Sequence, residues 1–323
     1  MLGRAWCLSA ALVLAAAPLA ARAQDYPSRP VKIVVGFGAG GLGDITTRAV
    51  AQKLSDQMGQ GFVIENMPGA GGITATASVA KAAPDGYTLL LISGQNATAP
   101  LVFKTLPFDP STDFRHVSTI STFDFIIVVA KASPLESIAD LVARAKAEPS
   151  RFNLGTISAG SLQHLMSHLL VARAGLSVPT VPFRTTADLL SAVLSGEVQA
   201  AIETIPGVIG QVQSGQLRAL ALSGAQRRAL LPGVPTVTEA GVSGYTVTSW
   251  NGFVVPAKVP DAIVARLNAE IAKALAQPDL EQRFGELGLV PTPSSPEQMR
   301  KVYDEDVERW RGVIADAKLK LQQ

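Results

Sequence analysis

The chain has 323 residues, of which 47% are hydrophobic and 6% aromatic, and its 28 basic residues nearly balance its 26 acidic ones. This balance, without a basic stripe or a Lys/Arg run, argues against nucleic acid and anionic membrane surfaces as partners. A chain of this length can bury a sizeable core, and we expect two domains.

The first 23 residues have the composition of a secretory signal peptide. Arg4 supplies a positive charge, Trp6 to Ala17 are mostly apolar, and Ala21-Arg22-Ala23 is a small-residue cleavage site. The apolar stretch is too short to span a membrane. We therefore expect export, with cleavage near Ala23. Cys7, the only cysteine, would be lost with the leader, which leaves neither disulfides nor thiolate metal sites.

Strand-like and helical stretches alternate along most of the chain, which predicts an α/β protein with doubly wound sheets. Segments with helical spacing separate the strands, and after about Trp250 helices dominate, with the strongest at Pro260–Ala276 and Pro296–Leu321. Many of the predicted strands are continuously apolar, as expected for parallel strands covered on both faces. They are Val31–Val35, Phe62–Glu65, Tyr87–Ile92, Phe125–Ala130, Phe152–Thr156, Thr180–Phe183, Val198–Ile202 and Leu217–Leu222.

Four short motifs predict where helices start and end. Ser133-Pro134-Leu135-Glu136 and Ser295-Pro296-Glu297-Gln298 each combine a Ser N-cap, a Pro at the first helical position and a capping side chain two residues further on. Gly175 and Gly196 lie where glycines commonly end the preceding helix.

The first predicted strand runs into a glycine-rich turn, Gly36 to Gly43, and then into a helix that starts near Asp44. Such a turn leaves backbone N–H groups free at a helix N-terminus, which suits a carboxylate or a phosphate. The alternative is a tight turn that needs only the freedom of glycine. The turn also matches the dinucleotide pattern G-x-G-x-x-G twice, with Glu65 placed to bind a ribose. Export argues against NAD, because it removes the protein from the usual nicotinamide pool.

A second turn of this kind precedes a helix in the other half of the chain, at Gly160-Ser161. Ligands of α/β sheets bind beyond the carboxyl ends of the strands, where both turns lie. We therefore expect two lobes whose helix N-termini face one cleft. A further glycine-rich loop, Glu65 to Gly72, either lines this cleft or forms a surface turn.

Hydroxyl and imidazole side chains near the second turn raise two alternatives to simple binding. Ser158, Ser161 and His164 suggest a hydrolase, but the G-x-S-x-G elbow is missing, which favours a helix cap or a donor to a carboxylate. His164 and His168 have the i, i+4 spacing of a zinc site. The Glu of H-E-x-x-H is absent and only His116 remains as a third imidazole. Helix-surface or interdomain histidines are the favoured interpretation.

Three other side chains are candidates for the cleft. Arg184 and Glu203 each follow a predicted strand, so an Arg could hold a carboxylate and a Glu could take an ammonium or a hydroxyl. The two could equally pair with each other. Trp250 either caps a ligand or connects the lobes.

A series of motifs in the same order along the whole mature chain makes it resemble the Bug-type extracytoplasmic solute receptors of tripartite tricarboxylate transporters. The motifs are Tyr26–Val35, Gly40-Gly41 with Asp44, Glu65–Gly72, Ala83–Leu90, Gly160-Ser161 with His164-Leu165, Val181–Phe183, Leu230–Gly241, Trp250 with Gly252, and Arg266–Asn268.

The resemblance implies a type II periplasmic binding protein with two lobes, each a doubly wound, mostly parallel sheet flanked by helices. Residues 24–123 and 247–323 would form lobe 1, and residues 124–246 lobe 2. The implied function is to bind a small organic carboxylate and deliver it to membrane permease subunits, as a monomer, without catalysis, cofactor, metal or nucleic acid.

In this family, the first β–α loop and the Gly-Ser loop embrace ligand carboxylates, largely through backbone N–H groups and ordered water. Glu203 stands where the family usually has Asp. The family's Pro-Phe-Pro-Pro-Gly-Gly is replaced by Gly36-Phe-Gly-Ala-Gly-Gly41, which predicts a more flexible unliganded loop, and Val-Pro-Tyr-Lys-Gly appears as Val181-Pro-Phe-Arg-Thr185. Both changes concern ligand identity rather than fold. The predicted ligand-binding residues are Gly38, Ala39, Gly40, Gly41, Asp44, Ser93, Ser158, Gly160, Ser161, Arg184 and Glu203.

Two other functions stay open at this point. One is an exported NAD(P)-dependent oxidoreductase that uses the first glycine-rich turn. The other is a ligand-sensing partner of a membrane signalling protein, which would use the same cleft and differ only in the surface that docks.

Overall fold

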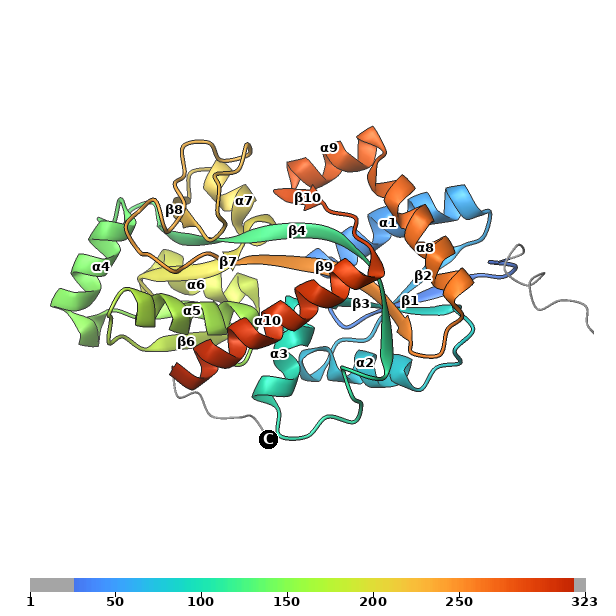
Figure 1. Cartoon of the computed structure of the whole chain (residues 1–323). Coiled ribbons are helices and arrows are strands. Elements are labelled where there is room, and N and C mark those ends of the chain that lie inside the picture. The colour runs from blue at the N-terminus through green and yellow to red at the C-terminus, as the bar shows by residue number, and fades with distance from the viewer. Residues whose placement is uncertain (1–25, 317–323) are drawn as a thin grey trace, which may run out of the picture.

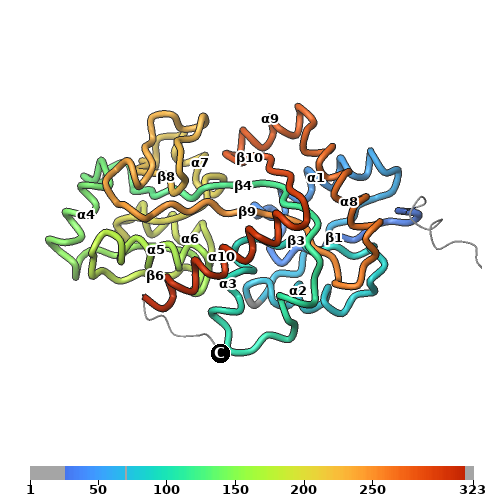
Figure 2. Tube along the Cα trace, in the orientation of Figure 1, coloured from blue at the N-terminus to red at the C-terminus, as the bar shows by residue number. Residues whose placement is uncertain are grey.

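The computed structural model describes residues 26–316 of the chain (Figures 1 and 2). The predicted signal peptide, with its cleavage site, and the last residues of the predicted C-terminal helix lie outside this range. Among the described residues, none of the helices has both the length and the apolar character needed to cross a membrane.

The strands form a mixed sheet that extends through two lobes. In lobe 1, β2 (Phe62–Asn66), β1 (Val31–Val35) and β3 (Thr88–Ser93) are parallel, and β9 (Thr248–Pro256) continues this sheet antiparallel to β3. In lobe 2, β6 (Thr180–Phe183), β5 (Leu154–Ile157) and β7 (Ala200–Thr204) are parallel. Each lobe thus has a parallel core extended by antiparallel strands.

One long strand, β4 (Phe114–Ala130), belongs to both lobes. Its first part pairs with β9 and with the short β10 (Leu289–Pro291), and its second part pairs with β7 and β8 (Leu217–Leu222). The change of partner is abrupt, since Asp124 lies opposite Thr248 of β9 and Phe125 lies opposite Thr204 of β7. Figure 1 shows β4 and β9 running beside each other from one lobe toward the other.

Helices cover both faces of each sheet half. Those of lobe 1 are α1 (Leu42–Met58), α2 (Ile73–Ala80), α3 (Gly94–Val102), α8 (Asp261–Leu275), α9 (Pro278–Glu286) and α10 (Pro296–Asp316). Those of lobe 2 are α4 (Ile138–Ala147), α5 (Leu162–Arg173), α6 (Thr186–Ser195) and α7 (Ile205–Gln213). Short 3-10 turns lie at η2 (Ala70–Gly72) and η3 (Pro149–Arg151).

The continuously apolar strands are explained by burial on both faces. In β3, Leu89 and Leu91 pack into the core beneath α1 and α8, while Leu90 and Ile92 pack into a separate cluster with α2 and α10. Successive side chains of a strand point to opposite faces, so both sets must be apolar when both faces are covered.

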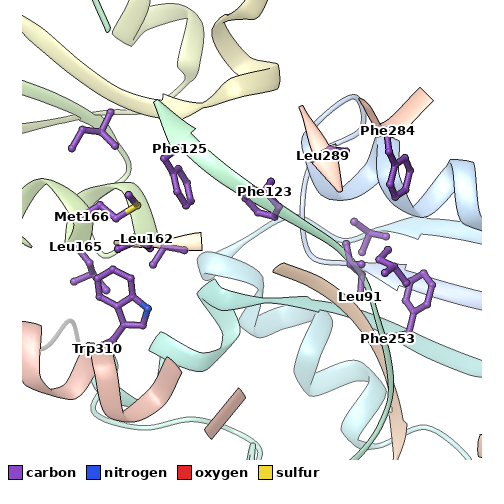
Figure 3. Close-up of a cluster of buried hydrophobic side chains, with 14 of the residues drawn as sticks. Leu91, Phe123, Phe125, Leu162, Leu165, Met166, Phe253, Phe284, Leu289 and Trp310 are labelled. Atoms are coloured by element: carbon purple, nitrogen blue, oxygen red, sulfur yellow. The ribbon is translucent and has the colours of Figure 1, made fainter. Parts of the chain in front are cut away.

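The largest core cluster connects the two lobes (Figure 3). Phe253 of β9 and Phe123 of β4 belong to it, and it continues to Leu165 of α5. Trp310 of α10 is fully buried and lies beside Leu165 in Figure 3, so the C-terminal helix of lobe 1 packs against a helix of lobe 2.

The strand predictions missed the first part of β4, all of β9 and the short β10. The predicted strand Phe125–Ala130 begins eleven positions earlier, at Phe114. No apolar pattern marks this first part, because it buries polar residues such as Ser118 and Thr119, which form hydrogen bonds with Ser294 and Thr292. The strand β9 was missed because Asn251-Gly252 has the composition of a turn. Gly252 is instead required by close packing, since a Cβ there would lie 2.8 Å from the carbonyl oxygen of Ser118.

Of the two predicted Ser-Pro helix starts, one was wrong. Helix α4 begins at Ile138, and Ser137 is its N-cap, accepting the N–H of Asp140 at 3.1 Å. Ser133 instead accepts the N–H of Leu135 within a turn. The second start is confirmed, because Ser295 accepts the N–H of Gln298 and Gln298 accepts the N–H of Ser295 in return.

Candidate functional site

A cavity of about 930 Å³ lies where the two lobes meet. Its walls are formed by the segments that follow β1, β2 and β3 in lobe 1 and β5, β6 and β7 in lobe 2, with Ser249 and Asn251 of β9 and Phe123 and Phe125 of β4. The segments that follow the parallel strands stand at their carboxyl ends, where ligands of α/β sheets bind.

Six helices begin at this cavity, three from each lobe. The residue immediately before the first turn of each helix lines the wall, so the positive ends of six helix dipoles point toward one space. The N-cap residues of α1, α2, α3, α5, α6 and α7 are Gly41, Gly72, Ser93, Ser161, Thr185 and Thr204.

The first glycine-rich turn leaves helix α1 without a capping side chain, because its N-cap is Gly41. Within the described part of the chain, the N–H groups of Leu42, Gly43 and Asp44 donate to no protein acceptor. Gly40 adopts a left-handed φ of +80°, which favours glycine. The turn therefore offers consecutive free N–H groups, the arrangement that binds anions at helix N-termini.

Asp44 supports this turn from behind and is not among the residues that line the cavity. Its carboxylate accepts the N–H of Gly40 at 2.8 Å, an amide hydrogen of Asn66 at 2.9 Å and the Nε–H of Arg48 at 3.0 Å. Burial would raise the pKa of Asp44, but the hydrogen bonds from Arg48, Gly40 and Asn66 outweigh it and lower the pKa. Asp44 is therefore a support of the turn in this structure, and its predicted contact with a ligand stays a prediction.

Glycines let the first two glycine-rich loops touch each other. Gly69, Gly71 and Gly72 line the cavity, so the loop from Glu65 to Gly72 is part of its wall and not an isolated surface turn. A Cβ at Gly36 would lie 2.9 Å from the Cα of Gly72, so a side chain there would push the loops apart.

The second turn, from Ser158 to Ser161, has a less common backbone conformation. Ser158 has a φ of +36°, a region that non-glycine residues rarely adopt, and Gly160 has a φ of +80°. Ser161 caps helix α5 by accepting the N–H of His164 at 3.1 Å, and its hydroxyl donates to the carbonyl of Ile157 at 2.6 Å. No base is positioned on the Ser161 hydroxyl among the described residues, so the geometry is that of a cap.

Arg184 and Glu203 are the only charged side chains among the described residues that line the cavity, and they form no ion pair with each other within this range. Glu203 is buried and accepts hydrogen bonds from Gln163 at 3.1 Å, from Thr186 at 3.0 Å and from the N–H of Thr204 at 2.6 Å. Arg184 is exposed. The anion-binding character of the cavity therefore rests more on helix N-termini than on charged side chains.

The structure brings most of the predicted set together. Asp44 alone of that set is not among the lining residues, and whether the others contact a ligand stays a prediction. Those that line the cavity are Gly38, Ala39, Gly40, Gly41, Ser93, Ser158, Gly160, Ser161, Arg184 and Glu203.

Sequence reasoning missed several polar residues of the wall. Gln95 and Thr98 follow β3 on α3, so the rule of strand carboxyl ends could have found them. Ser249 and Asn251 belong to the strand that was not predicted, and no local signal marked them. Ser249 is buried, and its hydroxyl has no hydrogen-bond partner among the described residues.

Two candidates have structural roles away from the cavity. Trp250 is buried, and its Nε1–H donates to Asp306 of α10 at 2.7 Å, so it neither caps the cavity nor bridges the lobes. Glu65 pairs with Lys32 at 3.0 Å and does not line the cavity. The acidic residue that the dinucleotide interpretation needs is therefore not in the wall.

The histidines have no third metal ligand among residues 26–316. The Nε2 atoms of His164 and His168 are 3.3 Å apart, but no group of three or more His, Cys, Asp or Glu side chains in residues 26–316 could hold a metal ion. Burial, and secondarily His168, lowers the pKa of His164 to about 4. His116 lies in lobe 1 on β4, and burial lowers its pKa to about 4 as well.

Comparison with known proteins identifies the family. Residues 46–319 match the family described as the tripartite tricarboxylate transporter family receptor. The protein BugT of Bordetella pertussis is 33% identical over 312 residues, which cover 95% of this chain and 94% of BugT. The chain belongs to this receptor family.

Solved structures agree with the receptor fold. Rpa4515 of R. palustris, determined with adipate, has a TM-score of 0.86 and 32% identity, covering 92% of this receptor and 100% of that chain. MatC of Rhodopseudomonas palustris, determined with bound malate, has a TM-score of 0.80 and 30% identity over 90% of this receptor and 100% of that chain. The periplasmic binding protein BugD has a TM-score of 0.82 and 30% identity over 92% of this receptor and 100% of its own chain.

Proposed function

We propose that this receptor binds a small organic carboxylate in the cavity between its lobes, without catalysis, and delivers it to the membrane permease subunits of a tripartite tricarboxylate transporter. The observation that carries the proposal is the convergence of six helix N-termini, three from each lobe, on one cavity. The adipate and malate held by its relatives Rpa4515 and MatC support this ligand class.

The proposal explains why the site needs so few cationic side chains. One helix N-terminus contributes about 0.3–2 kcal/mol to holding an anion. Termini from both lobes act together only when the lobes close on the ligand, because the effect falls off within the first turn of each helix. Carboxylate binding and lobe closure would therefore favour each other.

The two connections between the lobes are the expected hinges. We place the boundaries at residues 123/124 and 246/247, with residues 24–123 and 247–323 in lobe 1 and residues 124–246 in lobe 2. The switch of β4 between partners at Asp124 and Phe125 supports the first boundary, and the start of β9 at Thr248 supports the second.

The proposal also covers the export, location and oligomeric state of the receptor. We propose that residues 1–23 are a signal peptide cleaved near Ala23, and that the mature receptor acts in the periplasm as a monomer. The composition of the leader and the description of its relative BugD as a periplasmic binding protein support this location.

A thermal-shift screen of the mature protein tests the ligand class. Mono-, di- and tricarboxylates, including adipate and malate, are compared with their neutral amides at equal concentration. We expect at least one acid to raise the melting temperature while its amide does not, since a ligand at 100 times its Kd stabilises the fold by about 2.7 kcal/mol. If no carboxylate stabilises the protein, and NAD or NADP does, the receptor function is wrong and an exported oxidoreductase is favoured.

A role in sensing uses the same cavity, so ligand binding alone does not distinguish it from transport. Capture of membrane partners by the liganded receptor distinguishes the two roles. Transport predicts that permease subunits are captured, and sensing predicts a signalling protein.

A further inference from the structure

A chain of polar contacts within lobe 2 runs from the second turn of the cavity to β6. The Nδ1 of His164 accepts the N–H of Gly160 at 3.1 Å. The Nε2 of His164 lies 3.3 Å from the Nε2 of His168, which in turn lies 3.3 Å from the hydroxyl of Thr180 on β6. We call Gly160, His164, His168 and Thr180 the histidine relay.

The geometry determines where the protons of the relay lie. A backbone N–H can only donate, so the Nδ1 of His164 carries no proton, and neutral His164 must carry its proton on Nε2. That proton faces His168, whose Nε2 must then accept, so His168 carries its own proton on Nδ1. The Thr180 hydroxyl can only donate to the same nitrogen. The Nε2 lone pair of His168 is then shared by two donors, His164 and Thr180, which agrees with the long distance of 3.3 Å in both contacts.

This assignment requires both histidines to be neutral, and their burial favours the neutral form. Burial lowers the pKa of each, and for His164 the value falls to about 4. A metal ion bound through both Nε2 atoms would force the proton of His164 onto Nδ1, where it would face the N–H of Gly160. The relay and a bridging metal therefore exclude each other, which is a second reason to regard the pair as structural.

The turn from Ser158 to Ser161 has a strained backbone that the contact with His164 can stabilise. Ser158 holds a φ of +36°, and backbone conformations of this kind persist only where surrounding contacts enforce them. Within the described residues, the N–H groups of Ala159, Leu162 and Gln163 donate to no protein acceptor, whereas that of Gly160 is turned inward to His164. The inward bond fixes the orientation in which its neighbours face the cavity.

We propose that His164 and His168 are positioning residues of the ligand site, which hold the turn from Ser158 to Ser161 in the conformation that presents its free N–H groups to the ligand. The inference rests on the proposed function for the nature of the ligand, but the state of the relay can be measured without any ligand.

Long-range ¹H–¹⁵N spectra of the mature, ¹⁵N-labelled receptor at pH 7 test the proton positions. We expect His164 as the Nε2–H tautomer and His168 as the Nδ1–H tautomer, with His116 as the third signal. A His164 that carries its proton on Nδ1, or that is charged at pH 7, overturns the relay. Hydrogen exchange of the Gly160 amide is a second measurement, and it should become at least about tenfold faster when the acceptor is removed.

A pair of variants tests the effect on binding. His164→Phe keeps an aromatic ring but removes the acceptor, and we expect Kd for the best carboxylate of the screen to rise about tenfold, as when a hydrogen bond is left unmade. His164→Asn places an amide oxygen near the former Nδ1, so affinity should recover to within about threefold of the wild type. Arg173→Gln, at the exposed far end of α5, is the matched control and should leave Kd unchanged.

The outcomes separate this proposal from the proposed function. Equal affinities of the wild type, His164→Phe and His164→Asn, all folded at the assay temperature, overturn the positioning role. Loss of affinity in both variants, without recovery in Asn, shows a structural effect and also overturns it. If the wild type itself binds no carboxylate, the proposed function fails, and the tautomers and the Gly160 exchange still decide the relay.

Discussion

At the scale of single residues, the first glycine-rich turn depends on contacts with neighbouring segments of lobe 1. Asp44 connects the turn to the helix and to β2 through Gly40, Arg48 and Asn66. Gly36 is needed for contact with Gly72. Asp44 therefore supports the turn without lining the cavity.

The hydrogen bonds of Asp44 predict a pH-dependent contribution to stability. Asp44→Asn should lower the free energy of unfolding at pH 7 by about 1–3 kcal/mol, because the amide cannot accept the same set of bonds. A carboxyl whose pKa is lowered by folding stabilises the fold above its unfolded pKa and loses this effect as the pH falls through the folded value. The difference between variant and wild type should thus shrink below pH 3.8, the ordinary value for this carboxyl.

Urea unfolding at pH 7 and at the lowest pH where both proteins fold measures this difference. Asp56→Asn is the control, since Asp56 is exposed on the same helix and accepts only from Gln52 among the described residues. A difference for Asp44→Asn that is the same at both pH values would show that its charge is not involved.

Neighbouring glycines of the same turn should respond in opposite ways to alanine. Gly36→Ala places a Cβ 2.9 Å from the Cα of Gly72, so we expect a loss of about 1–3 kcal/mol in unfolding free energy. Gly38→Ala meets nothing within 4 Å and should be neutral, or stabilising by up to about 1 kcal/mol, because it restricts the unfolded chain. Thermal unfolding of both variants checks this, and equal melting temperatures would contradict it.

At the scale of elements, the strands with simple apolar patterns were predictable and the polar ones were not. The observed bounds of β1, β6 and β8 match the prediction. In β1 every residue except Lys32 is buried, as expected for a strand covered on both faces, whereas β6 is a partly exposed strand at the edge of the sheet. The first part of β4, all of β9 and the short β10 were missed. In β4 and β9, residues such as Thr119, Asn251 and Gly252 are held by contacts that are distant in the sequence. Such contacts leave no local periodicity.

The start of helix α4 gives a direct test of the corrected cap. Ser137→Ala should lower the free energy of unfolding by about 1 kcal/mol, because the N–H of Asp140 loses its acceptor. Ser133→Ala is the matched control and should cost less, since Ser133 only accepts a long bond within a turn, at 3.3 Å. A larger effect at Ser133 than at Ser137, measured by urea unfolding, would restore the original prediction.

At the scale of the whole molecule, the point where β4 passes from one lobe to the other contains a buried ion pair. Asp124 is fully buried, accepts the hydroxyl of Thr248 on β9 at 2.8 Å and pairs with Arg228 of lobe 2. A Cβ at Gly224 would collide with the Asp124 carboxylate, so a glycine is required there. These contacts fasten both connecting strands to lobe 2.

Two adjacent arginines should therefore differ in their effect on stability. Arg228→Gln leaves the buried carboxylate of Asp124 without its cation and should cost about 3 kcal/mol of unfolding free energy. Arg227→Gln breaks an exposed pair with Glu239 and should cost less than about 1 kcal/mol. Denaturant unfolding of both variants measures the difference, and similar costs would mean that the Asp124 pair does not stabilise this junction.

The sequence by itself determined the α/β alternation, the apolar strands, and the glycine-rich turns before helices. These follow from local rules: covered strands need apolar side chains, and turns with free N–H groups need glycine or a cap. Only the tertiary structure decided which groups face the cavity. It turned Asp44 and Trp250 inward, placed Ser249 and Asn251 in the wall, and brought six helix starts together. Contacts between residues far apart in the chain decide which way a side chain points and which helices of the two lobes converge. A local sequence pattern does not encode such contacts.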